Sequence, residues 1–552
     1  MEEPPDSSLT GERMHSKGSI ILLLALLMLC GPAMQSESAA SAAQGGTYFF
    51  PLNKDIVTLD PAMSTDTVSS TVIVRVYEGL VGFSKEGSYD PRLAESWEVS
   101  ADGLTWTFNL RKRVKFHDGR PFTSKDVVYS FERLLDPETA SPRTWVLDRI
   151  DGAEEFMSGD ADKVSGIKAV GKYKVRIQLA EPFAPFLGML AQNNAAIVSR
   201  PAVERDEMEK APVGTGPFHL KTRTDSEIEL HSFDAYWKRD GFGEKLPYLD
   251  GITFRVIKEP LSRWREFRTG RLHHTDIPLG HLGQVNSDSE LKAMKMSRPV
   301  LDMHHMAFNL EKEPFKDNTS LRLAFNYGVD KEGLIRTVKD GDAVKARSYV
   351  PPGIDGYNVK LPGYRYNPER ARQLLRQAGY PGGRGLPKIT LYADTDEDHR
   401  KVAEYVINDL KRLGIEIELK TLEWGAFLDA TYNGEAAFFQ NTWLADYPDP
   451  ENFLYVLLHS SMWGSAGNQT RYGNDEFDEY CEEAGVITDW EKRIELYRQA
   501  EEIAYEDAPW LLLYFRNCTI LKQPEVKGLT LSPLDRAPVL PGVDLREVRI
   551  DG

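Results

Sequence analysis

The chain has 552 residues, 27% of them charged, and a net charge of −17 at pH 7. This length predicts more than one domain, and the acidic surplus speaks against nucleic acid and anionic membranes as partners, because both need a basic protein face. Three cysteines are too few for a disulfide scaffold or a thiolate metal cluster. We therefore expect a soluble protein built on large hydrophobic cores.

The first 43 residues have the pattern of a secretory signal peptide. An apolar run over residues 20–29 is too short to span a bilayer and has the length of a signal-peptide core. Basic residues precede it, and small residues over 38–43 offer cleavage sites. The residues before Met14 are acidic, so Met14 is an alternative start. We expect residues 1–43 to be removed and the mature chain to be periplasmic, without a membrane span.

The cysteines leave two questions. Cys30 ends the apolar run and could carry a lipid, but Leu29 stands where a lipoprotein signal has a small residue. We therefore favour soluble export over lipid anchoring at Cys30. Cys481 and Cys518 remain in the mature chain, where the sequence is consistent both with a disulfide and with two separate buried thiols.

The first half of the chain predicts a mixture of strands and helices. Residues 97–110 alternate between apolar and polar side chains about a turn at 101–103, which predicts a β-hairpin. Residues 123–126 resemble a capping box, and they open a helix whose apolar face is Val127, Val128, Phe131, Leu134 and Leu135. Residues 172–179 alternate again as a strand.

The second half has the pattern of an α/β domain. Asn367 and Pro368 predict a helix start, and Gly379 predicts its end. Later elements are a βαβ unit with strands at 389–392 and 415–419, a strand at 436–442, a helix at about 490–505, and a strand buried on both faces at 510–515.

Motifs for catalysis are missing from the chain. The phosphate-binding loop, the nucleophile elbow of serine hydrolases and the zinc-protease helix motif do not occur. The histidine pairs at 273–274 and 304–305 are adjacent residues, so their side chains point to different sides and form no natural metal-binding face. We expect these histidines to be solvated or hydrogen-bonded, and we expect neither a metal nor another cofactor.

One segment, residues 443–453, is the main candidate for a binding site. Asp446 lies just past the predicted strand at 436–442, where open α/β sheets bind their ligands. Trp443 and Tyr447 flank it, and a carboxylate among aromatic rings suits an ammonium group. A structured surface loop is the alternative interpretation.

Short motifs along the chain match one known family. They are LDP at 59–61, YEGL at 77–80, PRLAESW at 91–97, KFHDGRPF at 115–122, DVVYS at 126–130, GTGPF at 214–218, FN at 308–309, YNPE at 366–369 and DYPDPENF at 446–453. Through their number, order and spacing the chain resembles the dipeptide/oligopeptide-binding family of solute-binding proteins that serve ABC importers, extracellular solute-binding protein family 5. The resemblance covers nearly the whole mature chain.

The resemblance implies an α/β fold of two lobes, the class II periplasmic-binding-protein fold, which closes over its ligand at a hinge. Lobe I would take residues 44–298, with an extra subdomain at about 76–212. Lobe II would take residues 299–521, and the C-terminal tail at 522–552 would return to lobe I.

The resemblance also implies a ligand site around Asp446. In peptide-binding members, the aspartate at this position pairs with the α-ammonium group of the ligand, and Trp443 and Trp424 match aromatic positions near that pocket. Backbone groups from Thr442 to Ala445 would pair with a peptide as an added strand does. A place in the hydrophobic core is the alternative for Trp424.

One departure from the family concerns the carboxyl end of the ligand. Dipeptide-specific members place an arginine before the helix that corresponds to residues 401–413, but the matching run at 392–398 is acidic and contains none. This departure speaks against strict dipeptide recognition and favours a longer peptide or a ligand without a C-terminal carboxylate. The acidic run itself predicts a solvated loop and a helix start, where negative charge is favourable.

We expect a monomeric, non-enzymatic carrier that captures peptides, in particular oligopeptides, and delivers them to the permease subunits of an ABC importer. The first alternative is the same fold with another ligand: a nickel complex, haem, a sugar, an opine or another cationic metabolite. The second is a secreted hydrolase with Asp446 and Asp449 as a carboxylate pair. Against it, Asp449 precedes Pro450 and an apolar run, which predicts a helix N-cap.

Overall fold

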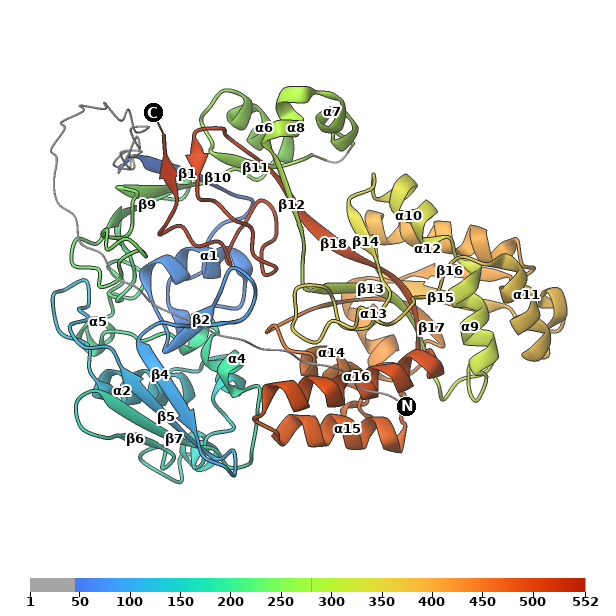
Figure 1. The fold of residues 1–552 in the computed structure, drawn as a ribbon, viewed down its shortest axis with the longest axis horizontal. Helices are drawn as coiled ribbons and strands as arrows, with labels where there is room; N and C mark the ends of the chain where they lie inside the picture. Colours follow the sequence, from blue (N-terminus) through green and yellow to red (C-terminus); the bar gives the residue numbers. More distant parts are fainter. Residues whose placement is uncertain (1–44, 279, 552) are drawn as a thin grey trace, which may run out of the picture. The chain divides into compact units, whose positions relative to one another are not determined.

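The computed structural model describes residues 45–278 and 280–551 (Figure 1). The predicted signal peptide, the alternative start at Met14 and the lipid question at Cys30 lie outside the described residues. Within the described ranges, no helix has the length and hydropathy needed to cross a membrane.

A four-stranded sheet holds the beginning of the described chain. Its order is β1–β10–β9–β8, with β1 parallel to β10 and the other neighbours antiparallel. Apolar residues of β1 are buried in one cluster with helix α1 and with residues of the C-terminal tail at 522–552. The bounds are β1 (Thr47–Leu52), α1 (Thr67–Val76), β8 (Phe218–Arg223), β9 (Glu227–Ser232) and β10 (Gly251–Val256).

A second four-stranded sheet, β4–β5–β7–β6, is antiparallel throughout and lies beside helix α2 (Figure 1). The predicted hairpin is confirmed as β4 and β5, since Trp97 lies opposite Phe108. The capping box predicted at residues 123–126 opens α2. The bounds are β2 (Val81–Phe83), β3 (Tyr89–Pro91), β4 (Ala94–Val99), β5 (Thr105–Leu110), α2 (Ser124–Leu135), α3 (Ala153–Met157), β6 (Ile167–Ala169), β7 (Lys174–Gln178), α4 (Phe186–Leu190) and α5 (Arg200–Glu204).

The largest sheet is mixed and has eight strands. Its order is β11–β18–β13–β17–β15–β16, and β12 and β14 also pair with β18. The predicted βαβ unit is confirmed as β15, α12 and β16, with the two strands parallel. The bounds are β11 (His274–Asp276), β12 (Lys295–Pro299), β13 (Asp302–Phe308), β14 (Ala343–Lys345), β15 (Ile389–Ala393), α12 (Glu397–Lys411), β16 (Ile417–Thr421), β17 (Phe438–Leu444) and β18 (Trp510–Lys522).

Strand β18 is longer than the sequence predicts. The apolar run ends at Phe515, but the strand continues to Lys522 because its second half pairs with β11 and β12. Its first half pairs with β13 and β14. Strand β18 therefore joins β11 and β12 to β13 and β14 in one sheet. The expected lobe boundary at 298/299 falls within β12 and stays a prediction.

Helices follow the strands of the second half, and α15 and α16 lie side by side (Figure 1). The helix predicted at 490–505 is confirmed as α16, and the helix predicted from Asn367 is confirmed as α11. The bounds are α6 (Pro260–Arg268), α7 (Leu282–Ser287), α8 (Ser289–Met294), α9 (Thr319–Gly328), α10 (Lys331–Val338), α11 (Pro368–Gln377), α13 (Trp424–Tyr432), α14 (Glu451–Leu458), α15 (Asp475–Val486) and α16 (Trp490–Asp507).

The start of α11 gives a direct test of local stability. The Oδ1 atom of Asn367 accepts the backbone N–H of Arg370 at 3.0 Å. We expect Asn367→Ala to lower the free energy of unfolding by about 1 kcal/mol, because it removes the acceptor for a helix-start donor. Asn367→Asp keeps that acceptor and serves as the control. Urea unfolding measures both variants, and equal losses in the two would contradict the capping role.

Cys481 and Cys518 are free thiols. Cys481 is buried in α15 within the cluster that also holds Trp510, whereas Cys518 is buried in the cluster around β1. The disulfide alternative is therefore wrong, and the two separate buried thiols are confirmed.

Both histidine pairs are buried. His273 accepts a backbone N–H at 2.8 Å, and His274 lies between the hydroxyl of Tyr48 at 3.0 Å and a carbonyl oxygen at 2.9 Å. The His305 ring is buried rather than solvated, and it stacks on Trp510 at 3.8 Å between centroids. Within residues 45–278 and 280–551, no cluster of three metal-binding side chains occurs.

The burial of His305 predicts a pH dependence of stability. Burial lowers the pKa of His305 from 6.5 to about 3. The unfolded chain therefore takes up the proton first as the pH falls, and stability is lost from pH 6.5 downward, by about 2 kcal/mol at pH 5. We expect His305→Phe to remove this contribution, so its free energy of unfolding falls less than that of the wild type between pH 7 and pH 5. If urea unfolding gives the same change in the free energy of unfolding between pH 7 and pH 5 for His305→Phe and for the wild type, this role of His305 is contradicted.

Candidate functional site

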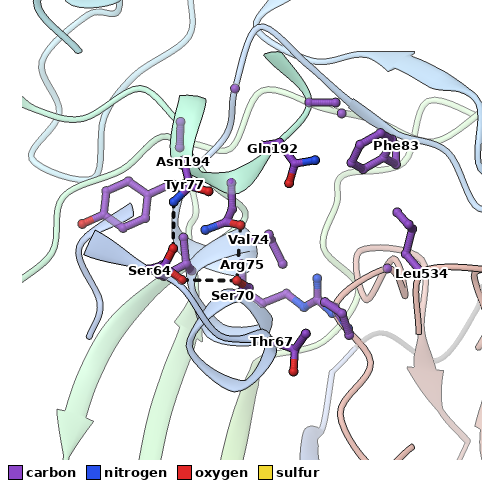
Figure 2. A pocket seen from close by; sticks show the side chains of 18 of the residues that line it. Ser64, Thr67, Ser70, Val74, Arg75, Tyr77, Phe83, Gln192, Asn194 and Leu534 are labelled. Carbon is purple, nitrogen blue, oxygen red and sulfur yellow. Dashed lines mark hydrogen bonds between the residues drawn. The ribbon is translucent and has the colours of Figure 1, made fainter. Parts of the chain in front are cut away.

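A cavity of about 370 Å³ lies between the end of β17, helix α1 and the C-terminal tail. Its walls come from α1 and the loop before it, from residues 77–83, from residues 191–194, from residues 444–446 and from tail residues 534–546. Figure 2 shows Ser70 and Arg75 of α1, Gln192 and Leu534 around this space. Segments from both ends of the described chain therefore meet one another at the cavity.

Asp446 lines this cavity just past the C-terminal end of β17, as its place in the sequence predicts. The residue as a whole keeps exposed surface at the cavity wall. The surrounding protein removes water from this carboxyl and raises its pKa above the ordinary value, whereas the nearby Arg143 guanidinium lowers it. The carboxyl group is thus partly desolvated and lies within the electrostatic influence of Arg143.

Asn452 of α14 holds the backbone of this segment. Its Oδ1 atom accepts the N–H of Asp446 at 3.0 Å and the indole N–H of Trp443, also at 3.0 Å. On the other side, the amide of Gln192 donates to the carbonyl oxygen of Asp446. A residue six positions further along and one from a distant segment therefore fix the backbone of Asp446.

The strand that leads to Asp446 has an unpaired edge. β17 pairs with β13 from Phe438 to Leu444, but it pairs with β15 only at Phe438 and Phe439. In the described part of the chain, no strand lies along the other edge of residues 440–444. On this stretch the N–H of Thr442 donates to the side chain of Asn441 at 2.8 Å. An extended backbone could pair with this edge as a further strand does.

Of the other predicted site residues, Ala445 belongs to the cavity wall and the remaining four do not. The N–H of Ala445 donates to the carbonyl oxygen of Leu301 at 2.8 Å. Thr442 and Trp443 stand on β17 and are partly buried. Tyr447 is buried, and its hydroxyl donates to the carboxyl group of Glu451.

Trp424 begins α13 and is 57% exposed, stacked on Phe427 at 5.8 Å between ring centroids. The alternative of a core position for Trp424 is therefore wrong, because its ring stands on the surface. Its predicted contact with a ligand stays a prediction.

Asp449 has a partner that the sequence does not reveal. Its carboxyl group forms a double hydrogen bond with Arg493 of α16, at 2.6 and 2.7 Å, and both side chains are almost completely buried. The predicted N-cap is wrong by one residue, since Pro450 takes that position, although Asp449 accepts the N–H of Glu451 at 2.9 Å. A buried and paired Asp449 has no open face toward a substrate, which speaks against the carboxylate pair of a hydrolase.

The acidic run at 392–398 has the predicted role at a helix start. Asp396 caps α12 and accepts two backbone N–H groups. Asp394 bonds His399 at 2.9 Å, and Asp398 pairs with Lys339 at 2.6 Å. None of these side chains lines the cavity of Asp446.

Comparison with known proteins identifies the family. A model described as "Bacterial extracellular solute-binding proteins, family 5 Middle" matches residues 88–465. Heme-binding protein A of Haemophilus influenzae is 33% identical to this chain, over 94% of this chain and 97% of its own length. The chain belongs to family 5 of the bacterial extracellular solute-binding proteins.

Other members of family 5 carry names of peptide-binding proteins. The dipeptide-binding protein of Escherichia coli is 29% identical, over 92% of this chain and 97% of its own length. The unliganded open form of the periplasmic murein tripeptide-binding protein MppA is 28% identical, with a TM-score of 0.81 over 92% of this chain and 98% of its own. The predicted two-lobed α/β fold of periplasmic binding proteins is therefore confirmed.

Sequence reasoning missed the arginines of this family 5 site. Arg75, Arg92, Arg143, Arg536 and Arg546 all line the cavity. They come from α1, from separate loops and from the tail, so no local motif groups them. Arg143 donates to the carbonyl oxygens of Ser64 and Thr65, at 3.3 and 3.0 Å. The cavity therefore offers positive groups as well as the carboxyl group of Asp446.

Proposed function

We propose that this family 5 protein captures peptides outside the cytoplasm and delivers them to the permease subunits of an ABC importer. The observation that carries the proposal is the carboxyl group of Asp446 at the wall of the cavity, on a backbone that Asn452 and Gln192 hold in place. A carboxylate in a partly desolvated place favours a cationic partner, and the α-ammonium group of a peptide is such a partner.

The unpaired edge of β17 supports a peptide rather than a smaller amine. A peptide whose ammonium group lies at Asp446 places its first residues along residues 440–444, where backbone hydrogen bonds recognise any sequence. Such binding tolerates many side chains, because main-chain groups supply the affinity. Trp443, Thr442 and Ala445 would then contact the first residues of the peptide, with Tyr447 and Trp424 farther from them.

The rest of the function follows from this carrier role. The protein acts as a monomer without catalytic activity, and its signal peptide directs it to the periplasm. Its acidic surface binds no nucleic acid, since phosphate recognition needs basic residues. Relatives named as dipeptide- and oligopeptide-binding proteins support the choice of ligand class.

Haem is the second candidate ligand. The relative that is 33% identical is named a haem-binding protein, and several arginines line the cavity. Arginine side chains bind carboxylates through paired hydrogen bonds, and haem carries two propionate carboxylates. In this case Asp446 would not contact an ammonium group.

Mass spectrometry of the ligand that leaves gently purified, exported protein tests the proposal. We expect short peptides of mixed sequence. A thermal-shift series with peptide pools and with haem provides the second measurement, because a bound ligand raises the melting temperature by mass action. Release of haem, with no peptide and with a thermal shift only for haem, would contradict the peptide proposal.

A further inference from the structure

Arg536 of the C-terminal tail is a cation without a partner in the cavity wall. Its Nε and Nη1 atoms are buried and form no hydrogen bond. The backbone N–H of Arg536 bonds the carbonyl oxygen of Val539 at 3.0 Å, which fixes the loop that carries it. Leu534 and residues 541–546 of the same tail also line the cavity.

The two carboxylates whose charge acts on Arg536, those of Asp302 and Asp535, accept hydrogen bonds from other groups. Asp302 accepts the side chain of Arg516 and the N–H of the same residue, the latter at 2.9 Å. Asp535 accepts backbone N–H groups of Ser532, Gly542 and Val543, between 2.6 and 3.1 Å. Within the described residues, no ion pair within 4.0 Å therefore neutralises Arg536.

Arg75 reinforces this positive region. Its Nη2 atom donates to the carbonyl oxygen of Leu540 in the tail at 2.9 Å, and its Nε atom is buried without a partner. Burial lowers the pKa of Arg75 to about 10 although Asp544 and Asp535 raise it, and burial together with Arg516 lowers the pKa of Arg536 to about 10. A buried cation that forms no ion pair is costly, and groups perturbed in this way cluster at functional sites.

We propose that Arg536 binds a carboxylate group of the ligand, with Arg75 supplying a second positive charge beside it. The proposal rests on the proposed function of the same cavity, and it adds a site for the opposite end of the ligand. The carboxylate is the C-terminus of a peptide or a propionate of haem, and the chemistry of the pairing is the same for both. The tail thereby supplies the arginine that the run at 392–398 lacks.

A cavity with Asp446 on one wall and Arg536 on another selects ligands that carry both charges. A peptide with free ends satisfies both groups, whereas an amidated or esterified ligand leaves Arg536 unpaired in the complex. Removing one partner of such a charge pair costs at least 2 kcal/mol, which corresponds to about a 30-fold loss of affinity.

Calorimetry with matched probes tests the proposal. The probes are alanine peptides of two to five residues with free ends, the same peptides as C-terminal amides, haem, and haem dimethyl ester. We expect the wild type to bind a free acid at least about 30-fold more tightly than its amide or ester, and Arg536→Gln to lose that preference. Arg549→Gln is the matched control, since Arg549 lies in the same tail, pairs with Asp551 at 3.5 Å and is absent from the cavity wall.

The outcomes separate the two proposals. If only the peptides bind more tightly as free acids than as amides, the bound carboxylate is the peptide C-terminus. If only haem binds more tightly than its dimethyl ester, the bound carboxylate is a propionate. Both results support Arg536, although the second contradicts the peptide function. Equal affinities for acid and amide in the wild type overturn the role of Arg536 and leave the peptide function intact. The ligand-free melting temperature of Arg536→Gln should equal or exceed that of the wild type, and a large decrease would assign Arg536 a structural role instead.

Discussion

Asp446→Asn is expected to weaken the binding of a peptide with a free amino terminus by roughly 2–5 kcal/mol, because it removes one partner of a desolvated charge pair. The asparagine keeps the size of the side chain and its hydrogen-bonding capacity, so the loss reports the charge. The backbone bonds of Asp446 to Asn452 and Gln192 remain available in the variant. Calorimetric titration with the peptide recovered from the purified protein measures the effect.

Two controls make the result specific for the ammonium group. An N-acetylated form of the same peptide should bind the wild type as weakly as the free peptide binds Asp446→Asn, and it should lose little more in the variant. Asp429→Asn makes the same charge change on the exposed side of α13, outside the cavity wall, and should leave the affinity unchanged. If Asp446→Asn binds the free peptide with unchanged affinity, the anchoring role of Asp446 is contradicted.

Arg493→Met should lower the free energy of unfolding of the ligand-free protein by about 3–5 kcal/mol, because it leaves a buried carboxylate unpaired. Asp449 is fully buried, and Arg493 supplies two of the hydrogen bonds that its carboxyl group accepts. Burial and the charge of Asp449 already raise the pKa of the neighbouring Glu451 to about 7. In the variant, the unpaired carboxylate of Asp449 would lie in the same buried place, where no water stabilises its charge.

Combining Arg493→Met with Asp449→Leu should recover much of that stability, since buried ion pairs are often replaced by apolar side chains at little cost. Urea unfolding of the two single variants and of the pair measures the coupling. The hypothesis is contradicted if Arg493→Met alone costs less than about 1 kcal/mol, the range of a surface pair, or if the pair is no more stable than Arg493→Met.

The sequence predicts the elements whose determinants are neighbours in the chain. The hairpin around residues 101–103, the cap at Asn367 and the βαβ unit from residue 389 depend on turn residues, caps and periodicity within a few positions. The same reasoning places Asp446 past the end of a strand, since a strand end is also a local feature. These predictions match the structure for that reason.

The sequence does not predict contacts between distant segments. Nothing near Asp449 indicates its pairing with Arg493, 44 positions away, so its acidic side chain before Pro450 resembles an ordinary helix cap. Arg75 and Arg536 face the same cavity from opposite ends of the described chain. Strand β18 also exceeds its prediction, because pairing with β11 and β12, rather than hydrophobicity, defines the residues after Phe515.

Strand β18 has a consequence for the order of folding. It pairs with β11, β12, β13 and β14, which precede it by roughly 170 to 250 residues. The central sheet therefore stays incomplete until residue 522 has been synthesised, and contacts over such distances form slowly because long loops must close first. The largest sheet of a nascent chain therefore forms late, whereas the sheet β4–β5–β7–β6 pairs strands that are closer along the chain and can form earlier.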